Sequence, residues 1–299
     1  MVVLLTGAGG FLGQNLISFL KIKGCKIYNL GKTPVSDSTH INLDDLNDKE
    51  TIKKAVAEIK PDYLFHLAGS SNTSSDIADS FMVNTFFSKF LLEAIEAANL
   101  DLHTKTIMMG SAAEYGFIKE DQLPISESTT PKPTTLYGIS KLAQTNIALS
   151  WQKSKRPLIL VRPFNVIGRG MPKHLAVGSF YQQIQLIDGK GVLKTGNLDN
   201  ERDFIDVSDV IYLMWELINN KESYGKVINL CSGKAVPMID IVRYMIDISG
   251  KDIDLITENS LMRVNDVKFH YGDNSKLLKL VGDFNFTPWK KTINQILET

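Results

Sequence analysis

The sequence predicts an α/β fold in which a doubly wound parallel sheet is joined to a smaller C-terminal lobe. Short apolar runs alternate with longer segments of helical apolar spacing, the first run leads directly into a glycine-rich turn, and the alternation loosens from about Gly168. Such alternation favours parallel strands linked by crossover helices. We expect residues 1–167 to form the sheet domain, a later segment, about 202–232, to complete its sheet, and residues 168–299 to form mainly the lobe.

The first strand and the turn after it are typical of a dinucleotide-binding unit. Val2–Leu5 is apolar and rich in β-branched residues, Thr6-Gly-Ala-Gly-Gly-Phe-Leu-Gly13 follows it, and Asn15–Leu20 has helical spacing. Glycines at this spacing permit a tight turn, close approach of the backbone to a pyrophosphate and close packing of helix on sheet. The helix amino terminus then faces the phosphates. We expect the cofactor to contact Gly7, Gly10, Phe11, Leu12 and Gly13.

The second strand, Lys26–Leu30, indicates which dinucleotide is bound. Folds that select NAD usually place an acid at its end to bind the ribose hydroxyls, but here the chain reads Leu30-Gly31-Lys32. A cation at Lys32 would attract a 2′-phosphate, which favours NADP(H) over NAD(H). After a third strand, Asp45 and Leu46 are placed to reach the adenine.

The remaining elements continue the alternation of strand and helix. We expect helices at Lys49–Ile59, Phe81–Ala98 and Leu136–Ser150, and strands at Tyr63–Leu67, Lys105–Gly110, Leu158–Val161 and Lys226–Leu230.

Tyr137 and Lys141 form the most informative pair in the chain. Residues four apart share a helix face. An ammonium close to a phenol favours the phenolate and lowers its pKa toward neutrality, which suits an acid and base for an alcohol/ketone couple. The pair therefore predicts a proton-transfer device on the helix Leu136–Ser150.

Composition favours a protein that acts on small molecules. The 299 residues include 33 basic and 33 acidic side chains, so no overall field indicates nucleic acid or a membrane surface. Cys25 and Cys231 are far apart and suit buried thiols in a reducing compartment. We expect no signal peptide, no membrane helix and a cytoplasmic location. The five histidines show no metal-type spacing, so no metal is expected, and His66 is expected to be a packed core residue.

Several motifs together identify a resemblance that spans essentially the whole chain. They are Thr6-Gly-Ala-Gly-Gly-Phe-Leu-Gly13, His66-Leu-Ala-Gly69, Asn84, Gly110-Ser111-Ala-Ala-Glu-Tyr-Gly116, Tyr137 with Lys141, Arg162-Pro-Phe-Asn-Val-Ile-Gly168 and Arg202-Asp203-Phe204. With these motifs the chain resembles the extended short-chain dehydrogenase/reductases that act on nucleotide-diphosphate sugars. The resemblance implies a Rossmann domain that binds NADP(H), with Leu67 and Ala68 at the cofactor, and a C-terminal substrate-binding lobe.

The resemblance also implies the roles of the catalytic residues. Tyr137 would be the proton donor or acceptor, Lys141 would bind the nicotinamide ribose and lower the tyrosine pKa, and Ser111 would hydrogen-bond the reacting oxygen. The sugar 4,6-dehydratases of the family carry an acid/base pair directly after the serine or threonine, where this chain has Ala112 and Ala113. A dehydratase is therefore disfavoured. Glu114, one place later, is expected to bind substrate, and it could serve in dehydration only if its side chain turns inward.

The substrate side of the resemblance rests on polar residues of the second half. Arg202 and Arg263 match positions where the family grips the substrate pyrophosphate, Asn165 would assist, and guanidinium groups suit phosphate oxygens. Gly-Asn-Leu-Asp-x-x-Arg-Asp is most similar to the GDP-4-keto-6-deoxy-mannose reductases. Gly168-Arg-Gly-Met-Pro-Lys173 and Val264 depart from the family pattern near the substrate, which leaves the sugar and the base open.

The sequence thus predicts an NADPH-dependent reductase of a nucleotide-linked 4-keto-6-deoxy sugar. An NDP-sugar 4-epimerase with tightly bound NAD is the alternative, and a non-catalytic NADP-sensing protein has no need of the catalytic trio. One further helix face is either core or half of a dimer contact, and we favour a homodimer. Its residues are Phe86, Phe87, Phe90, Leu91, Leu92 and Ile95.

Overall fold

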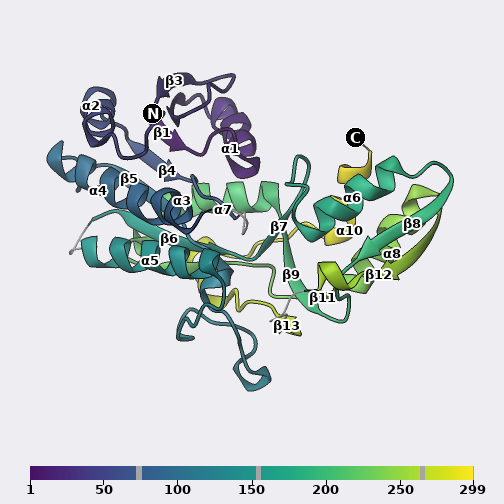
Figure 1. The fold of residues 1–299 in the computed structure, drawn as a ribbon. Helices are drawn as coiled ribbons and strands as arrows, with labels where there is room; N and C mark the ends of the chain where they lie inside the picture. The colour runs from purple at the N-terminus through teal and green to yellow at the C-terminus, as the bar shows by residue number, and fades with distance from the viewer. Residues whose placement is uncertain (72–75, 153–155, 263–266, 299) are drawn as a thin grey trace.

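A computed structural model describes residues 1–71, 76–152, 156–262 and 267–298. Figure 1 shows a sheet with helices on both faces, and beside it a second lobe that carries the C-terminal end of the described chain. β7 (Asn165–Ile167) and β9 (Glu201–Asp206) lie where the two parts meet.

The main sheet has seven strands, and every neighbouring pair is parallel. The chain order reverses between β1 and β4, which places a ligand crevice outside the carboxyl ends of these strands. This confirms the predicted fold class. In spatial order the strands are β10 (Val227–Leu230), β6 (Leu158–Pro163), β5 (Lys105–Met109), β4 (Tyr63–His66), β1 (Val2–Thr6), β2 (Lys26–Gly31) and β3 (Thr39–Asn42).

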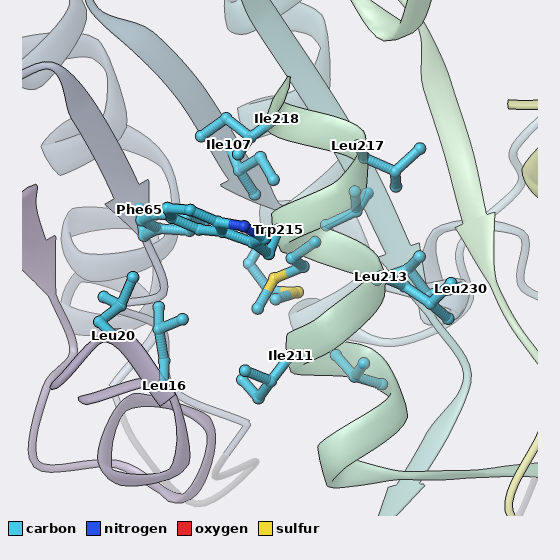
Figure 2. Packing of buried hydrophobic residues seen from close by; sticks show 14 of the residues in the cluster. Leu16, Leu20, Phe65, Ile107, Ile211, Leu213, Trp215, Leu217, Ile218 and Leu230 are labelled. Carbon is cyan, nitrogen blue, oxygen red and sulfur yellow. The ribbon is translucent and has the colours of Figure 1, made fainter. Parts of the chain in front are cut away.

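Helices bury both faces of this sheet because successive strand residues point to opposite sides. Val3 and Leu5 pack with α1 and α7, whereas Leu4 packs on the other face with α2 and α4. Figure 2 shows the first face, where Trp215 of α7 and Phe65 of β4 belong to one buried cluster. The helices are α1 (Phe11–Ile22), α2 (Lys49–Ile59), α4 (Phe87–Ala97), α5 (Leu136–Trp151), α7 (Val207–Asn219) and α9 (Ser275–Val281).

The second lobe has its own small sheets. β9 is the centre of a four-stranded sheet with β7, β11 (Ala235–Pro237) and β13 (Phe269–His270). Within the segment of about 202–232, β10 joins the main sheet at the edge beside β6, whereas β9 belongs to the small sheet. The predicted domain boundary near Gly168 follows the end of β7 and stays a prediction. The other elements are α6 (Ala176–Leu186), β8 (Lys190–Thr195), α8 (Met238–Ser249), β12 (Asp252–Thr257) and α10 (Trp289–Leu297).

The helix predicted at Phe81–Ala98 is divided into three parts. These are α3 (Ile77–Phe81), a π turn at Met82–Phe86 and α4. Asn84 lies in the π turn, fully buried, where its Oδ1 accepts from Ser70 N at 2.8 Å and its Nδ2 donates to Ser140 Oγ at 2.9 Å. A π turn adds a residue to the helix, and here it carries a polar side chain that joins the loop after β4 to α5.

Short 3₁₀ turns complete the described elements. They lie at Ala112–Glu114, Glu120–Gln122, Lys221–Ser223 and Asn259–Leu261.

Candidate active site

The glycine turn after β1 is packed too closely to admit side chains. Gly7 has φ +74°, and a Cβ there would lie 2.6 Å from Ala68 N in the loop after β4. A Cβ on Gly13 would lie 2.2 Å from Gly7 O. The loops after β1 and β4 therefore meet at the switch point of the sheet, with Leu67 and Ala68 beside the glycine turn.

The amino terminus of α1 has the properties of an anion site. Its N-cap, Gly10, makes no side-chain cap hydrogen bond, its first turn contains no acidic residue, and Gly9 and Gly10 are exposed. The first N–H groups of a helix have no partner within the helix and carry the positive end of its dipole. These residues fit the pyrophosphate of a dinucleotide. Phe11 packs against the cores of both lobes, and Leu12 packs against the core beneath α1.

The turn after β2 lies beside the glycine turn. Asn29 Nδ2 donates to Thr33 O at 2.9 Å, and Val35 Cγ2 lies 3.8 Å from the position of a Cβ on Gly9. Lys32 is exposed on this turn. The turn after β3 is adjacent, since Leu43 N donates to Gly31 O at 3.0 Å. It presents an exposed Asp45, whose Oδ1 accepts from Asn47 N at 2.8 Å, followed by Leu46, which is packed against the core.

Ser111 and Tyr137 meet where α5 begins. A Cβ on Gly138 would lie 2.5 Å from Ala113 O, so the first turn of α5 packs directly on the turn after β5. The side chain of Ser111 interacts with that of Tyr137 and favours its phenolate, and Ser111 Oγ accepts from Ala113 N at 3.1 Å. Lys141 lies one turn along α5 with 2% of its surface exposed. The structure therefore brings together Ser111, Tyr137 and Lys141.

The electrostatics of this trio correct one expectation. Burial raises the pKa of Tyr137 above its ordinary value, and the hydrogen bond with Ser111 opposes this shift. Burial lowers the pKa of Lys141 to about 8, against the attraction of Glu114. The expectation that Lys141 lowers the pKa of the tyrosine is not met, because desolvation dominates for both groups. Burial therefore favours the protonated phenol of Tyr137.

Glu114 is not at the substrate surface, and the expectation that it binds substrate is corrected. Its side chain is fully buried. Its carboxylate accepts from Ser111 N at 2.9 Å, from Thr145 Oγ1 at 2.9 Å and from Arg162 Nε at 2.9 Å. The carboxylate of Glu114 is therefore occupied by these three donors and is held next to the backbone of Ser111.

Two of the predicted substrate residues lie on the small sheet at the junction of the lobes. Asn165 begins β7, and its Nδ2 donates to Asp203 O at 2.8 Å. Arg202 lies on β9, and its Nη1 donates to Glu201 O at 2.9 Å. The third residue, Arg263, lies outside the described residues.

His270 reaches the same region, although the sequence did not indicate it. It pairs with Arg202 in the register of β13 with β9, and its ring centroid lies 5.3 Å from that of Phe164. Burial and the charge of Arg202 lower its pKa to about 4, and its interaction with the backbone of Ala112, next to Ser111, opposes this shift. No sequence spacing links residue 270 to residue 112, so strand pairing had to reveal this contact.

His66, by contrast, is the core residue that the sequence predicted. It is fully buried, with Nδ1 2.7 Å from Thr6 Oγ1 and Nε2 2.8 Å from Ser88 Oγ. It therefore ties the end of β1 to α4. In the part of the chain that the structure describes, no cluster of three or more His, Cys, Asp or Glu side chains could hold a metal, and no helix is long and apolar enough to cross a bilayer.

Comparison with known proteins agrees with this geometry. A family model described as the NAD dependent epimerase/dehydratase family matches residues 3–231. The chain is 31% identical over 300 residues to GDP-6-deoxy-D-talose 4-dehydrogenase of Aggregatibacter actinomycetemcomitans, covering 100% of this chain and 96% of that protein. It is 28% identical over 296 residues to GDP-6-deoxy-D-mannose reductase of Pseudomonas aeruginosa, covering 96% and 91%.

A solved structure extends the comparison to the fold. RMD from Pseudomonas aeruginosa, complexed with NADPH, matches with a TM-score of 0.85 and 25% identity over 99% of this chain and 97% of that chain. The resemblance drawn from the sequence motifs is thereby confirmed. The chain is an enzyme of the NAD-dependent epimerase/dehydratase family.

Proposed function

We propose that this enzyme uses NADPH to reduce the 4-keto group of a nucleotide-diphosphate 4-keto-6-deoxy sugar, GDP-4-keto-6-deoxy-mannose. The observation that carries the proposal is the meeting of Ser111 and Tyr137, where α5 packs on the turn after β5, beside the buried Lys141 at the carboxyl edge of the sheet. Two relatives act, by name, on GDP-linked 6-deoxy sugars. They support both the base and the sugar.

The trio suits the protonation of a carbonyl oxygen. When bound, NADPH supplies the hydride for the carbonyl carbon. Tyr137 holds the proton that the oxygen receives, and burial keeps that proton on the phenol until transfer. Ser111 Oγ already accepts from Ala113 N, so its own proton is directed to Tyr137 or to the substrate oxygen. Lys141, buried one turn along α5, is assigned to the nicotinamide ribose.

The segment after Ser111 disfavours dehydration. Ala112 is buried, and neither Ala112 nor Ala113 has an ionisable group. Elimination of water needs an acid and a base near the reacting carbons. Glu114 cannot supply either, because its carboxylate is fully buried and bound by Arg162 and Thr145. These residues favour simple reduction.

NADPH is the preferred reductant in this proposal because Lys32 stands on the turn beside the glycine loop, and no acid ends β2. The NADPH complex of the Pseudomonas aeruginosa relative supports the same choice. Lys32→Ala should raise the Kd for NADPH about tenfold or more, since a hydrogen bond to a charged group contributes about 1.5–3 kcal/mol. The Kd for NADH should stay unchanged. Equal losses for both cofactors, or a similar loss in the exposed Lys23→Ala, would contradict a 2′-phosphate contact.

We assign the diphosphate of the substrate to Arg202 and Arg263, with Asn165 assisting. The guanidinium of Arg202 lies on β9 next to His270, whose neutral imidazole contacts Ala112. This placement puts cationic and neutral polar groups on the lobe side of Ser111. We assign His270 to the same substrate surface.

The direct test is NADPH oxidation by the purified enzyme with freshly generated GDP-4-keto-6-deoxy-mannose. Parallel reactions contain NADH or a dTDP-linked 4-keto sugar. We expect rapid oxidation with NADPH and the GDP sugar. 6-Deoxy-mannose and 6-deoxy-talose differ only at carbon 4, so NMR of the product also assigns the face of reduction. No oxidation with any keto sugar, together with interconversion of NDP-hexoses without added cofactor, would identify an epimerase instead.

A further inference from the structure

We propose that Glu114 is a positioning residue that holds Ser111 in register with Tyr137 and Lys141. Its carboxylate contacts the three elements that carry or adjoin the catalytic groups. Oε1 accepts from Ser111 N at 2.9 Å. Oε2 accepts from Thr145 Oγ1 on α5 at 2.9 Å and from Arg162 on β6. The inference rests on the proposed function only for its kinetic assay.

The side chain of Glu114 is enclosed on all sides and can take only one position. It is fully buried, and a Cβ on Gly110 would lie 2.5 Å from Oε1, so glycine is required there. Thr145, 1% exposed, lies one turn after Lys141 on the face of α5 that also bears Tyr137. The hydrogen bond from Thr145 therefore joins the helix of the proton donor directly to the turn of Ser111.

Arg162 compensates the buried charge of Glu114. Its Nη2 lies 2.8 Å and its Nε 2.9 Å from Glu114 Oε2. Its guanidinium also covers the ring of Tyr115 at 4.7 Å, and Tyr115 Oη donates to Asn229 Oδ1 at 2.6 Å. The desolvation cost of a buried ion pair often cancels its attraction, so such a pair need not add stability. The Glu114–Arg162 ion pair instead fixes the geometry of the turn after β5, and we assign it that positioning role.

That geometry determines where the hydroxyl of Ser111 points. Ser111 Oγ accepts from Ala113 N while Glu114 accepts from Ser111 N, and these two hydrogen bonds form a capping box over Ala112–Glu114. The two bonds fix the turn that carries the serine hydroxyl next to the first turn of α5, where Tyr137 lies. Proton transfer depends steeply on such alignment, and a displacement of about 1 Å can reduce the rate about a hundredfold.

A pair of matched threonine variants tests the inference. Thr145→Val removes the hydroxyl that bonds Glu114 Oε2 at 2.9 Å, and Thr292→Val removes the buried hydroxyl that bonds Asp206 Oδ2 at 2.8 Å in the second lobe. Both lose one buried hydroxyl-to-carboxylate bond, so their melting temperatures should fall similarly. We expect kcat to fall about tenfold or more in Thr145→Val alone, with NADPH affinity unchanged. Equal kcat in the two variants would overturn the inference.

A double variant separates positioning from stability. In Glu114→Met/Arg162→Met the charges are removed together, so no unpaired charge is buried and the fold should persist. Positioning predicts that this protein binds NADPH with wild-type affinity but turns over at least about tenfold more slowly. A folded double variant with wild-type kcat would show that the ion pair is only structural.

One readout requires no substrate and so remains valid if the proposed function fails. The tyrosinate absorbance of each protein is titrated, and the contribution of Tyr137 is isolated by subtracting the matching Tyr137→Phe curve. Because the hydrogen bond with Ser111 opposes the raised pKa of Tyr137, loosening Ser111 should raise that pKa further in Thr145→Val. An unchanged titration would count against positioning, whatever sugar the wild-type enzyme accepts.

Discussion

At the scale of single residues, the site depends on ionisable groups removed from water. Burial raises the pKa of Tyr137 and lowers that of Lys141 to about 8. The phenol therefore carries the proton at neutral pH, while the ammonium is close to its own titration point. Perturbed pKa values of this kind cluster at functional sites.

Tyr137→Phe should abolish turnover because it removes the proton donor and leaves the ring packing intact. We expect kcat to fall by about 10²–10⁴, the usual contribution of general acid catalysis. The Kd for NADPH, measured by fluorescence quenching, should stay near its wild-type value. Near-normal kcat would refute the assignment of Tyr137 as the proton donor.

Lys141 should make stability depend on pH. Its folded pKa is about 8 and its ordinary value is 10.5. Between these values the unfolded chain binds more protons than the folded chain, so the free energy of unfolding should rise with pH. Lys141→Met should remove that rise and stabilise the protein at pH 7, by up to about 3 kcal/mol. Urea titrations at pH 7 and pH 9.5 measure the free energy of unfolding of each protein, and the exposed Lys23→Met variant is the control. If the free energy of unfolding rose with pH as steeply in Lys141→Met as in the wild type, the lowered pKa of Lys141 would be contradicted.

At the scale of elements, the sequence patterns predicted those features that depend on residues close together in the chain. The strand Val2–Thr6, its glycine turn and α5 were predictable, because apolar periodicity and turn chemistry act over a few residues. The interior position of Glu114 was not, because it depends on Arg162 and Thr145, which arrive from β6 and α5. His270 was missed for the same reason, since the pairing of β13 with β9 places it.

The glycine turn supplies a prediction about an element. A Cβ on Gly13 would lie 2.2 Å from Gly7 O, whereas a Cβ on Gly9 meets nothing closer than 3.8 Å. Gly13→Ala should therefore destabilise the protein by about 1–3 kcal/mol, as overpacking does, and weaken NADPH binding. Gly9→Ala should leave the melting temperature of the cofactor-free protein unchanged. Equal melting temperatures for both variants would show that α1 does not pack on the turn as described.

At the scale of the whole molecule, the candidate active site lies where the main sheet meets the small sheet around β9. Phe11 packs against the cores of both parts, and the small sheet around β9 carries Arg202 and His270 toward Ser111. The sequence predicted Lys226–Leu230 as the last strand of the main sheet but did not indicate the small sheet around β9. Strand length and apolar pattern do not specify which sheet a short strand joins. In the folded chain β10 occupies the edge of the main sheet beside β6, and β9 lies in the small sheet.

The helix face expected to be core or dimer contact is largely core. Phe87, Phe90, Leu91, Leu92 and Ile95 are all buried within the chain. We propose that a homodimer forms through the apolar side chains that stay exposed on α5 and the π turn. These are Phe86, Leu136, Ile139 and Leu149, each 41–46% exposed.

A charge on this face should separate the two subunits. Ile139→Glu should convert a wild-type dimer into a monomer, because an unpaired charge in an apolar interface is costly to desolvate. Ile22→Glu, at an exposed position of α1, should leave the dimer intact. Light scattering after size exclusion measures both. A monomeric wild type, or a dimeric Ile139→Glu, would contradict this interface.

The central claim, hydride transfer from NADPH to the 4-keto carbon, is tested most directly with NADPH deuterated at the transferable position. The enzyme is incubated with this NADPH and GDP-4-keto-6-deoxy-mannose, and the sugar product is analysed by mass spectrometry and NMR. We predict one deuterium, located at carbon 4 of the sugar. A product without deuterium, or a sugar whose configuration changes without consumption of NADPH, would contradict the account.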